Sequence, residues 1–308
     1  MVESFLTVGQ SVLHLFLMGA VGFLLGKVKM MDDRAAVGMT NLLLYICTPF
    51  MMVVAFQNAP SDGGMRGFAI AAALTLLFHL IMIPVAHLVI RQKDPRQRSV
   101  FRLAAILSNC GFMALPLQSA LLGSAGVFYG SAYNIVFNLV AWTYGLSMIT
   151  GGSAKPSLKQ LLNPGLLGVI AALVLFLLGI RVPDLLMPPL THVGNLTIPL
   201  PMIVIGYQLS QADLRSVLRQ SGLWLSMLLR LLIFPAMALA LMLVLRIDRT
   251  ILLALMIAAA APSAAIVNMF AVSYGGDSEL SSSTVATHTL FSCLTMSLIV
   301  GLAMALTR

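Results

Sequence analysis

Apolar stretches of about 20 residues follow one another along almost the whole chain, separated by short polar loops. A helix needs roughly this length to cross a bilayer, and in lipid its backbone groups bond within the segment. The sequence therefore predicts an all-α polytopic membrane protein. We expect ten spans, at residues 7–26, 36–57, 66–90, 99–121, 125–149, 164–181, 191–210, 219–246, 250–274 and 280–305.

Composition and charge support this class. Of the 308 residues, 59% are apolar and only 9% are charged, as in proteins embedded in lipid. The formal charge of +8 comes from short loops and forms no continuous basic face, which argues against nucleic acid as a partner. The first positive charge, Lys27, follows the first apolar stretch, so we interpret that stretch as an uncleaved span.

Lysine and arginine are unevenly shared between alternate loops. The loop between the third and fourth spans, residues 91–98, contains the densest group, and most other basic loop residues fall on the same side. The positive-inside rule places that side in the cytoplasm. We therefore expect both termini on the periplasmic or extracellular side of a bacterial inner membrane.

Two of the apolar stretches are interrupted near their middle. The segments Ser108–Pro116 and Ala260–Asn268 place asparagine, serine, glycine and proline where hydrocarbon tolerates none of them well. Backbone groups freed there have to be satisfied by protein, water or a ligand. Paired interruptions at corresponding places in two halves of a chain point to the binding site of a transporter.

The polar loop 151–163 divides the predicted spans into five and five. Because five is odd, a repeat of residues 1–150 in residues 164–308 has to be inverted in the membrane. Proline positions agree with such a repeat, since Pro84 lies in the third span and Pro235 in the eighth. Inverted halves of this kind rock or slide to give alternating access, and 151–163 would be a cytoplasmic linker.

Arg230 and His79 are ionisable residues within predicted spans, each five residues before a proline. Intramembrane charges are costly, so each is a candidate functional group. Arg230 could attract an anionic substrate, or it could satisfy carbonyl groups freed at the broken helices. The sequence leaves these two roles of Arg230 open.

Uncharged polar residues also mark the predicted interior. Asn109 and Asn268 lie in the interruptions, and half-helix N-termini there would favour negative charge. Asn134 and Asn138 share a helical face and could line the same cavity or bond between helices. The tenth span is rich in hydroxyl groups, including Ser283 and Thr287, which favour close packing but could also line a polar or Na⁺ site.

Residues and motifs that the sequence lacks argue against several classes of protein. No Asp or Glu lies at the centre of a predicted span, which disfavours a cation/proton antiporter. The sequence contains no zinc-helix pattern, nucleophile elbow or phosphate-binding glycine loop, so we expect neither an enzyme nor an ATP-driven pump. We expect no cofactor or metal, and leave coupling to Na⁺ or H⁺ open.

With these residues placed, the chain resembles the auxin efflux carrier family over nearly its whole length. The resemblance rests on Asn109–Leu117, on Ala261–Ala264 with Tyr274, and on Asn41 with Pro49. It implies an inverted five-plus-five fold similar to bile-acid symporters and sodium/proton antiporters. Spans 1, 2, 6 and 7 would be a scaffold and spans 3–5 and 8–10 a moving core. The broken spans 4 and 9 would cross at Pro116 and Pro262, with Gly111 near the substrate.

The resemblance also implies a substrate class. Family members move organic carboxylates, and the compact chain looks like the bacterial branch associated with malonate. We therefore expect an elevator-type transporter of a small organic anion that forms a homodimer through its scaffold. The alternatives are a sodium-coupled symporter of amphipathic anions and, outside transport, a receptor or enzyme using the same cavity.

Overall fold

The structure is a computed structural model that describes residues 2–59, 64–154, 157 and 162–307. Lys155 and Lys159 of the predicted linker lie outside the described residues. The described chain is helical apart from its connecting loops, and its one β-type feature is an isolated bridge.

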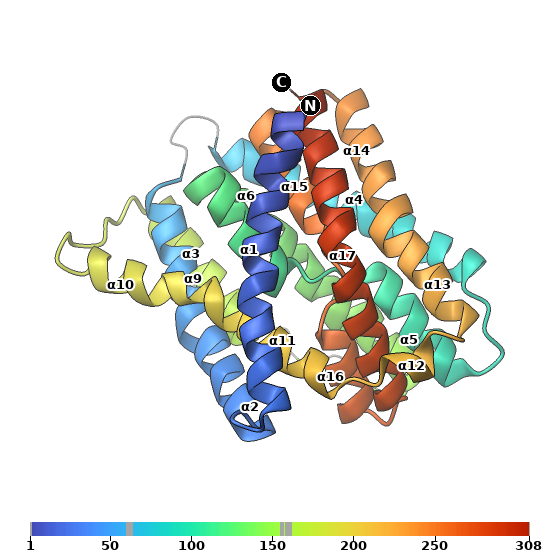
Figure 1. The fold of residues 1–308 in the computed structure, drawn as a ribbon. Coiled ribbons are helices and arrows are strands. Elements are labelled where there is room, and N and C mark those ends of the chain that lie inside the picture. Colours follow the sequence, from blue (N-terminus) through green and yellow to red (C-terminus); the bar gives the residue numbers. More distant parts are fainter. Residues whose placement is uncertain (1, 60–63, 155–156, 158–161, 308) are drawn as a thin grey trace.

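Twenty-one helical segments make up the described chain, and Figure 1 shows their arrangement. The first half contains α1 (Val2–Lys27), α2 (Asp33–Leu42), η1 (Leu43–Cys47), α3 (Thr48–Gln57), α4 (Gly64–Val89), α5 (Pro95–Ile106), η2 (Cys110–Ala114), α6 (Leu115–Val140), η3 (Ala141–Gly145) and α7 (Leu146–Thr150). The second contains α9 (Pro164–Leu177), α10 (Met187–Gly194), η4 (Asn195–Thr197), α11 (Pro199–Gln211), α12 (Leu214–Val217), α13 (Ser221–Leu228), η5 (Leu229–Ile233), α14 (Phe234–Val244), α15 (Arg249–Ala260), α16 (Ile266–Ser273) and α17 (Ser278–Leu306).

Seven described helices are long and apolar enough to cross a membrane, which confirms the prediction of a polytopic all-α protein. Two further apolar helices, α9 and α15, are shorter than a full span. The longest candidate, Cys110–Thr150, has 41 residues and is interrupted at Gly123, whose backbone is non-helical with a positive φ of 60°. Ten spans and an inverted repeat remain predictions.

Prolines shape several of these helices through widened turns. The π-helical segments η1, η2 and η5 each end two residues before a proline, at Pro49, Pro116 and Pro235. Proline removes one N–H donor and crowds the carbonyl one turn earlier, and a wider turn accommodates both effects. The helix therefore continues through these prolines instead of ending at them.

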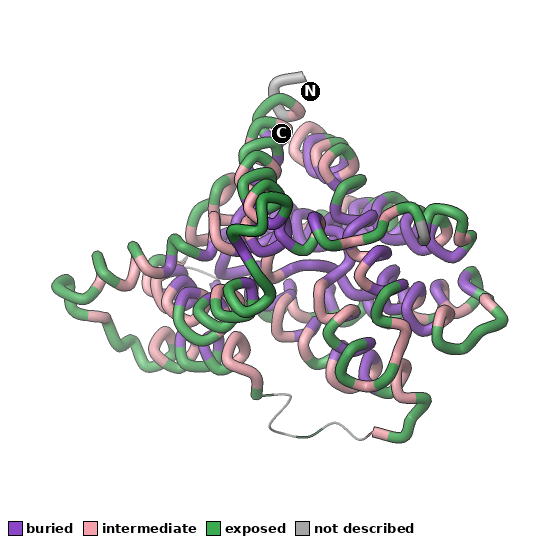
Figure 2. The backbone as a smooth tube through the Cα atoms, turned by 60° about the horizontal axis from the view of Figure 1, so that its bottom comes forward, coloured by how far each residue is buried: buried purple, intermediate pink, exposed green. Residues whose placement is uncertain are grey.

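Two groups of helices can be followed through the fold. In one, α1 packs along α11, and α3 packs against α9 and α10. In the other, α6 packs against α4 and α15, while α17 contacts α15 and α16. Small residues permit the closest approach, because a Cβ on Gly22 would lie 1.9 Å from the carbonyl oxygen of Ile203. Figure 2 shows the buried residues concentrated in the interior of the molecule.

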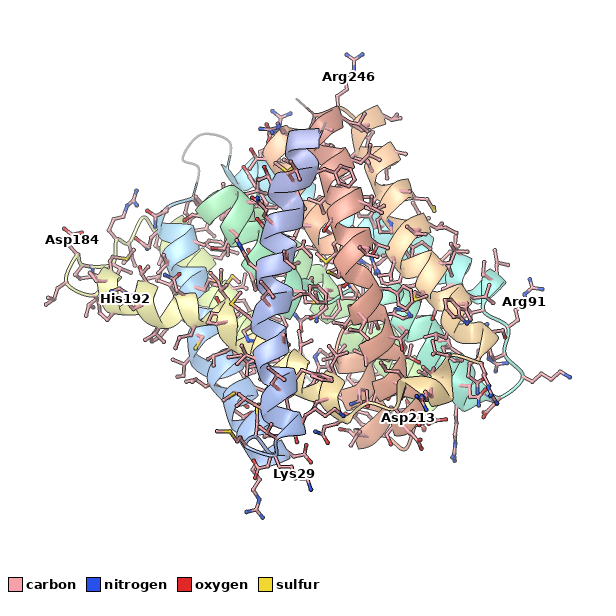
Figure 3. The ribbon with its side chains drawn as sticks, in the orientation of Figure 1. Lys29, Arg91, Asp184, His192, Asp213 and Arg246 are labelled. Carbon is pink, nitrogen blue, oxygen red and sulfur yellow. The ribbon has the colours of Figure 1, made fainter. Side chains whose placement is uncertain are left out.

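The outer surface is apolar along the helices and charged at their ends. Leu24 and Leu80 are each 60% exposed and Val244 is 79% exposed, as expected for side chains that face lipid. Arg246 lies at the end of the molecule that holds both termini, whereas Lys29 lies at the opposite end (Figure 3).

Candidate functional site

Two interrupted helices cross at the centre of the fold. The chain leaves helical geometry at Leu107–Asn109, between α5 and η2, and again at Ala261–Ala265, between α15 and α16. Ser108 pairs with Ser263 in an antiparallel bridge. These two extended segments satisfy one another's backbone groups, as burial in the absence of water requires.

Hydrogen bonds fix the geometry of this crossing. The N–H of Asn109 donates to the carbonyl of Pro262 at 2.7 Å, and the N–H of Ala264 donates to the carbonyl of Leu107 at 2.9 Å. The Asn109 side chain accepts from the N–H of Phe112 at 3.3 Å and so caps the helix that begins at η2. At the crossing, each broken helix therefore supplies hydrogen-bond partners for backbone groups of the other.

The position of the first break differs from the prediction. We expected the crossing at Pro116 and Pro262, and Pro262 does lie in the second break. Pro116 instead lies inside the helical run that starts at Cys110, beyond the π-turn η2. The physical reason is that the widened turn absorbs Pro116, while Asn109 provides a side-chain cap that starts the helix earlier.

Arg230 lies at the side of the crossing where α5 and α15 end. It is fully buried on η5, and one terminal nitrogen donates to the carbonyls of Ile106 at 3.0 Å and Ala105 at 3.3 Å. The other terminal nitrogen donates to the carbonyl of Ala259. The guanidinium therefore caps the C-terminal ends of both α5 and α15. Of the two roles that the sequence left open, these contacts match the satisfaction of freed carbonyls.

Histidine and tyrosine side chains lie beside this region. His79 is buried on α4, where its Nδ1 bonds the carbonyl of Thr75 at 2.8 Å, and its ring lies 5.8 Å from that of Tyr133. Tyr133 accepts a hydrogen bond from the hydroxyl of Ser108 at 3.2 Å, and so connects α6 to the crossing. His79 is thus held by its own helix and is not among the residues lining the polar cavity described next.

A small cavity of about 40 Å³ lies where the crossing meets α11. Its polar lining comes from the first break, from α16, from α17 and from α11, and it is completed by apolar side chains. The lining residues are Asn109, Ile205, Gln208, Leu209, Ala265, Asn268, Ser282, Val285, Ala286 and Thr289. None of these described lining residues is acidic.

Asn109 and Asn268, both predicted to bind substrate, thus line one cavity, and their role in binding stays a prediction. The Oδ1 atom of Asn268 accepts from the hydroxyl of Ser281 at 2.8 Å, which orients the amide. The starts of the η2 helix and of α16 also reach this cavity through Asn109, Ala265 and Asn268. Neutral amides and helix N-termini together form an environment that favours an anion.

The other two predicted asparagines lie elsewhere. Asn138 donates to the backbone and side-chain oxygens of Asn134, at 2.9 and 3.3 Å, and accepts from Asn163 at 2.7 Å. Asn163 caps α9, so this chain of amides joins α6 to the start of another helix. Gly111 lies beside it, since a Cβ there would be 3.9 Å from the Asn134 amide nitrogen. These three predicted residues do not line the cavity.

Hydroxyl groups of α17 line the cavity, but not the two that were predicted. Ser283 and Thr287 are buried on another face, where the Thr287 hydroxyl donates to the carbonyl of Ser283 at 2.7 Å. Ser282 and Thr289, seven residues apart, face the cavity instead. Adjacent helical residues point about 100° apart, and hydroxyl groups on every face of this segment concealed the correct one.

Gln208 of α11 is a cavity residue that the sequence reasoning missed. Its signal was a polar amide within an otherwise apolar predicted span, flanked by Tyr207 and Leu209. That signal does not say which other helix Gln208 faces. Only the packing of α11 against the crossing places it at the same cavity as Asn268.

Comparison with known proteins gives the family. The sequence profile described as "Membrane transport protein" matches residues 7–300. An uncharacterized transporter of Methanothermobacter thermautotrophicus is 22% identical over 296 residues, covering 94% of this chain and 96% of the relative. An uncharacterized transporter of Methanocaldococcus jannaschii is 23% identical over 300 residues, covering 93% and 95%. The chain therefore belongs to the membrane transport protein family, the auxin efflux carrier-like family that its sequence resembles.

Proposed function

We propose that this membrane transporter is a secondary carrier of a small organic anion, a carboxylate such as malonate or a similar dicarboxylate. The observation that carries the proposal is the cavity where Asn109 and Asn268 meet α11. Two half-helices start there, and each N-terminus contributes the equivalent of roughly +0.5 charge. With amide donors and without an acidic lining residue, this site would hold carboxylate oxygens.

Substrate entry requires a change of shape. A cavity of about 40 Å³ has room for one or a few water molecules, and a dicarboxylate is larger. Binding would therefore separate α11 from the crossing. In the proposed elevator movement, α4–α7 and α12–α17 slide as a core against a scaffold of α1–α3 and α9–α11, carrying the site between the two membrane faces.

The proposed topology has ten spans, arranged as inverted halves 1–150 and 164–308 with a linker at 151–163. The interruption at Gly123 supports dividing Cys110–Thr150 into two spans, since 41 helical residues would far exceed a bilayer. The broken pair α15 and α16 would form another. We further propose a bacterial inner-membrane location with both termini outside, and a homodimer through the scaffold, where Leu177 and Leu178 of the α9 end are exposed.

A sodium-coupled symporter of amphipathic anions is the second candidate. The observation that favours it is the hydroxyl lining from α17, because Ser282 and Thr289 oxygens beside unwound backbone could ligate Na⁺. This candidate requires anion uptake to depend on Na⁺. An enzymatic role has no support from the family, whose relatives are described as transporters.

The test is charge movement by the purified protein in liposomes, measured as solid-supported-membrane current on jumps of malonate, malate and indole acetate. We expect a saturable current for at least one acid. Asn268→Ala removes an amide that would bond the substrate, so the apparent affinity should fall about tenfold or more. Asn58→Ala, at the exposed residue that follows α3, is the matched control and should behave as wild type.

The outcomes separate the candidates. A current that persists when Na⁺ is replaced by a large organic cation supports the carrier of an anion alone, and a current only with Na⁺ supports the symporter. No current and no counterflow of labelled acid for any carboxylate would refute the proposed substrate class.

A further inference from the structure

Arg230 lies on the side of the crossing where the half-helices end. Its donors reach Ala105 and Ile106 at the end of α5, and Ala259 at the end of α15. The cavity lined by Asn109 and Asn268 instead receives the half-helix starts. The crossing thus separates two electrostatic environments, one of helix C-termini and one of helix N-termini.

The charges on the C-terminal side balance. Each helix C-terminus carries the equivalent of about −0.5 charge, so two of them together amount to roughly one negative charge. One guanidinium supplies one positive charge, and its fork of donors bonds carbonyls from both helices. Unwound carbonyls at half-helix C-termini are also the groups that coordinate a coupling cation in other transporters with broken helices.

We infer that Arg230 is a resident cation, which holds the position where a coupling ion would otherwise bind, and that the anion therefore crosses without Na⁺. The transport part of this inference rests on the proposed function, whereas the cation site does not. On this assignment a carried anion moves its own charge uncompensated, because the balancing cation is part of the chain.

A second cavity offers a way to test the assignment. It measures about 270 Å³ and is lined by Arg230 itself, by Tyr133 and by apolar side chains of α4 and α14 such as Phe78 and Phe234. The Nε atom of Arg230 is buried there without a hydrogen-bond partner among the described residues. Shortening this side chain would leave the carbonyls of α5 and α15 beside enough space for a small cation.

The experiment measures the thermal unfolding of Arg230→Ala and Arg230→Gln in detergent, with millimolar methylguanidinium, Na⁺ or Li⁺ against a large organic cation. We expect both variants to unfold at lower temperature than wild type. Methylguanidinium or a small cation should restore part of the loss, with a saturable rise of about 2 °C or more. Arg230→Lys keeps the charge and should show a smaller loss and no such rise.

Arg102→Ala is the matched control. Arg102 also caps a helix C-terminus, donating to the carbonyls of Ile90 at 3.0 Å and His87 at 3.1 Å, but outside the crossing. Neither this variant nor wild type should be stabilised by the added cations. Equal responses of wild type, Arg102→Ala and the Arg230 variants would overturn the inference. If the variants fail to fold even with cation present, the wild-type current decides, and a requirement for Na⁺ would overturn it.

The resident cation and the proposed substrate class can be refuted separately. Cation rescue of Arg230→Ala together with a wild type that transports no carboxylate would support the resident cation and refute the substrate class. A carboxylate current without cation rescue would do the reverse.

Discussion

The backbone N–H of Asn109 donates to the carbonyl of Pro262 at 2.7 Å, so an asparagine of one broken helix is tied to a proline of the other. Proline has no N–H, yet its carbonyl remains a strong acceptor. The bond places the Asn109 side chain at the start of the η2 helix and at the edge of the cavity. The orientation of this amide therefore depends on the groups that neighbour it at the crossing.

Ser281→Ala should weaken substrate binding without unfolding the protein. The Ser281 hydroxyl donates to Asn268 at 2.8 Å, and losing it frees the amide to turn. We expect the apparent affinity for the transported acid to fall by about three- to tenfold. Saturation of the current measures it. Ser292→Ala, buried on the same helix but bonded to Thr289, is the control, and an equal effect of both changes would contradict this role.

Gly206→Ala should destabilise the contact between α1 and α11. An added Cβ would lie 1.8 Å from the carbonyl oxygen of Gly19, which forces the two helices apart. Overpacking of this kind costs about 1–3 kcal/mol or more, visible as a lower unfolding temperature. Gly9→Ala on α1 meets no heavy atom within 4 Å and should be neutral or stabilising. Identical melting of the two variants would argue against close packing here.

A cross-link between α11 and α17 should stop transport if the core slides past the scaffold. Gln208→Cys and Ser282→Cys place two thiols at the same cavity, in a background lacking Cys47, Cys110 and Cys293. We expect a short bifunctional maleimide to abolish the current. Linking Trp224→Cys to Phe291→Cys, whose native rings lie 6.2 Å apart within the proposed core, should leave it intact. Full activity of the first cross-linked pair would exclude the proposed movement.

Labelling of intact cells checks the orientation. Met30 is 77% exposed in the loop after α1, and Leu185 is 85% exposed in the loop before α10. With both termini outside, an impermeant maleimide should label Leu185→Cys and spare Met30→Cys until the membrane is opened. The reverse pattern would invert the proposed topology.

Much of the helical layout follows from hydropathy, because lipid leaves the backbone few alternatives to helices. The sequence also identifies Asn109 and Asn268 as candidates, since they are polar residues within apolar stretches. The structure places both at one cavity. The first break was predicted too late in the chain because Pro116 looks like a helix breaker. A π-turn accommodates it, and local composition does not report that turn.

Other features depend on tertiary packing. The face of α17 that lines the cavity cannot be chosen from a segment with hydroxyl groups all round, and the structure places Ser282 there instead of Ser283. The contribution of Gln208 depends on how α11 docks. The role of Arg230 needed the positions of three carbonyls on two helices that are far apart in sequence.

The widened turns before Pro49, Pro116 and Pro235 have a consequence for how the chain tolerates change. A π-turn contains one residue more than an α-turn, so each acts like a one-residue insertion held within a helix. Deleting one residue from η5 and replacing Pro235 would permit a regular helix with the phase after it kept, whereas a regular helix formed without the deletion would rotate everything after it by about 100° relative to the part before. Lipid-facing and buried sides of α14 would then be exchanged in part. The helical phase on either side of each proline is thus set by these turns, and an alignment that ignores them would misassign the side chains that face the membrane.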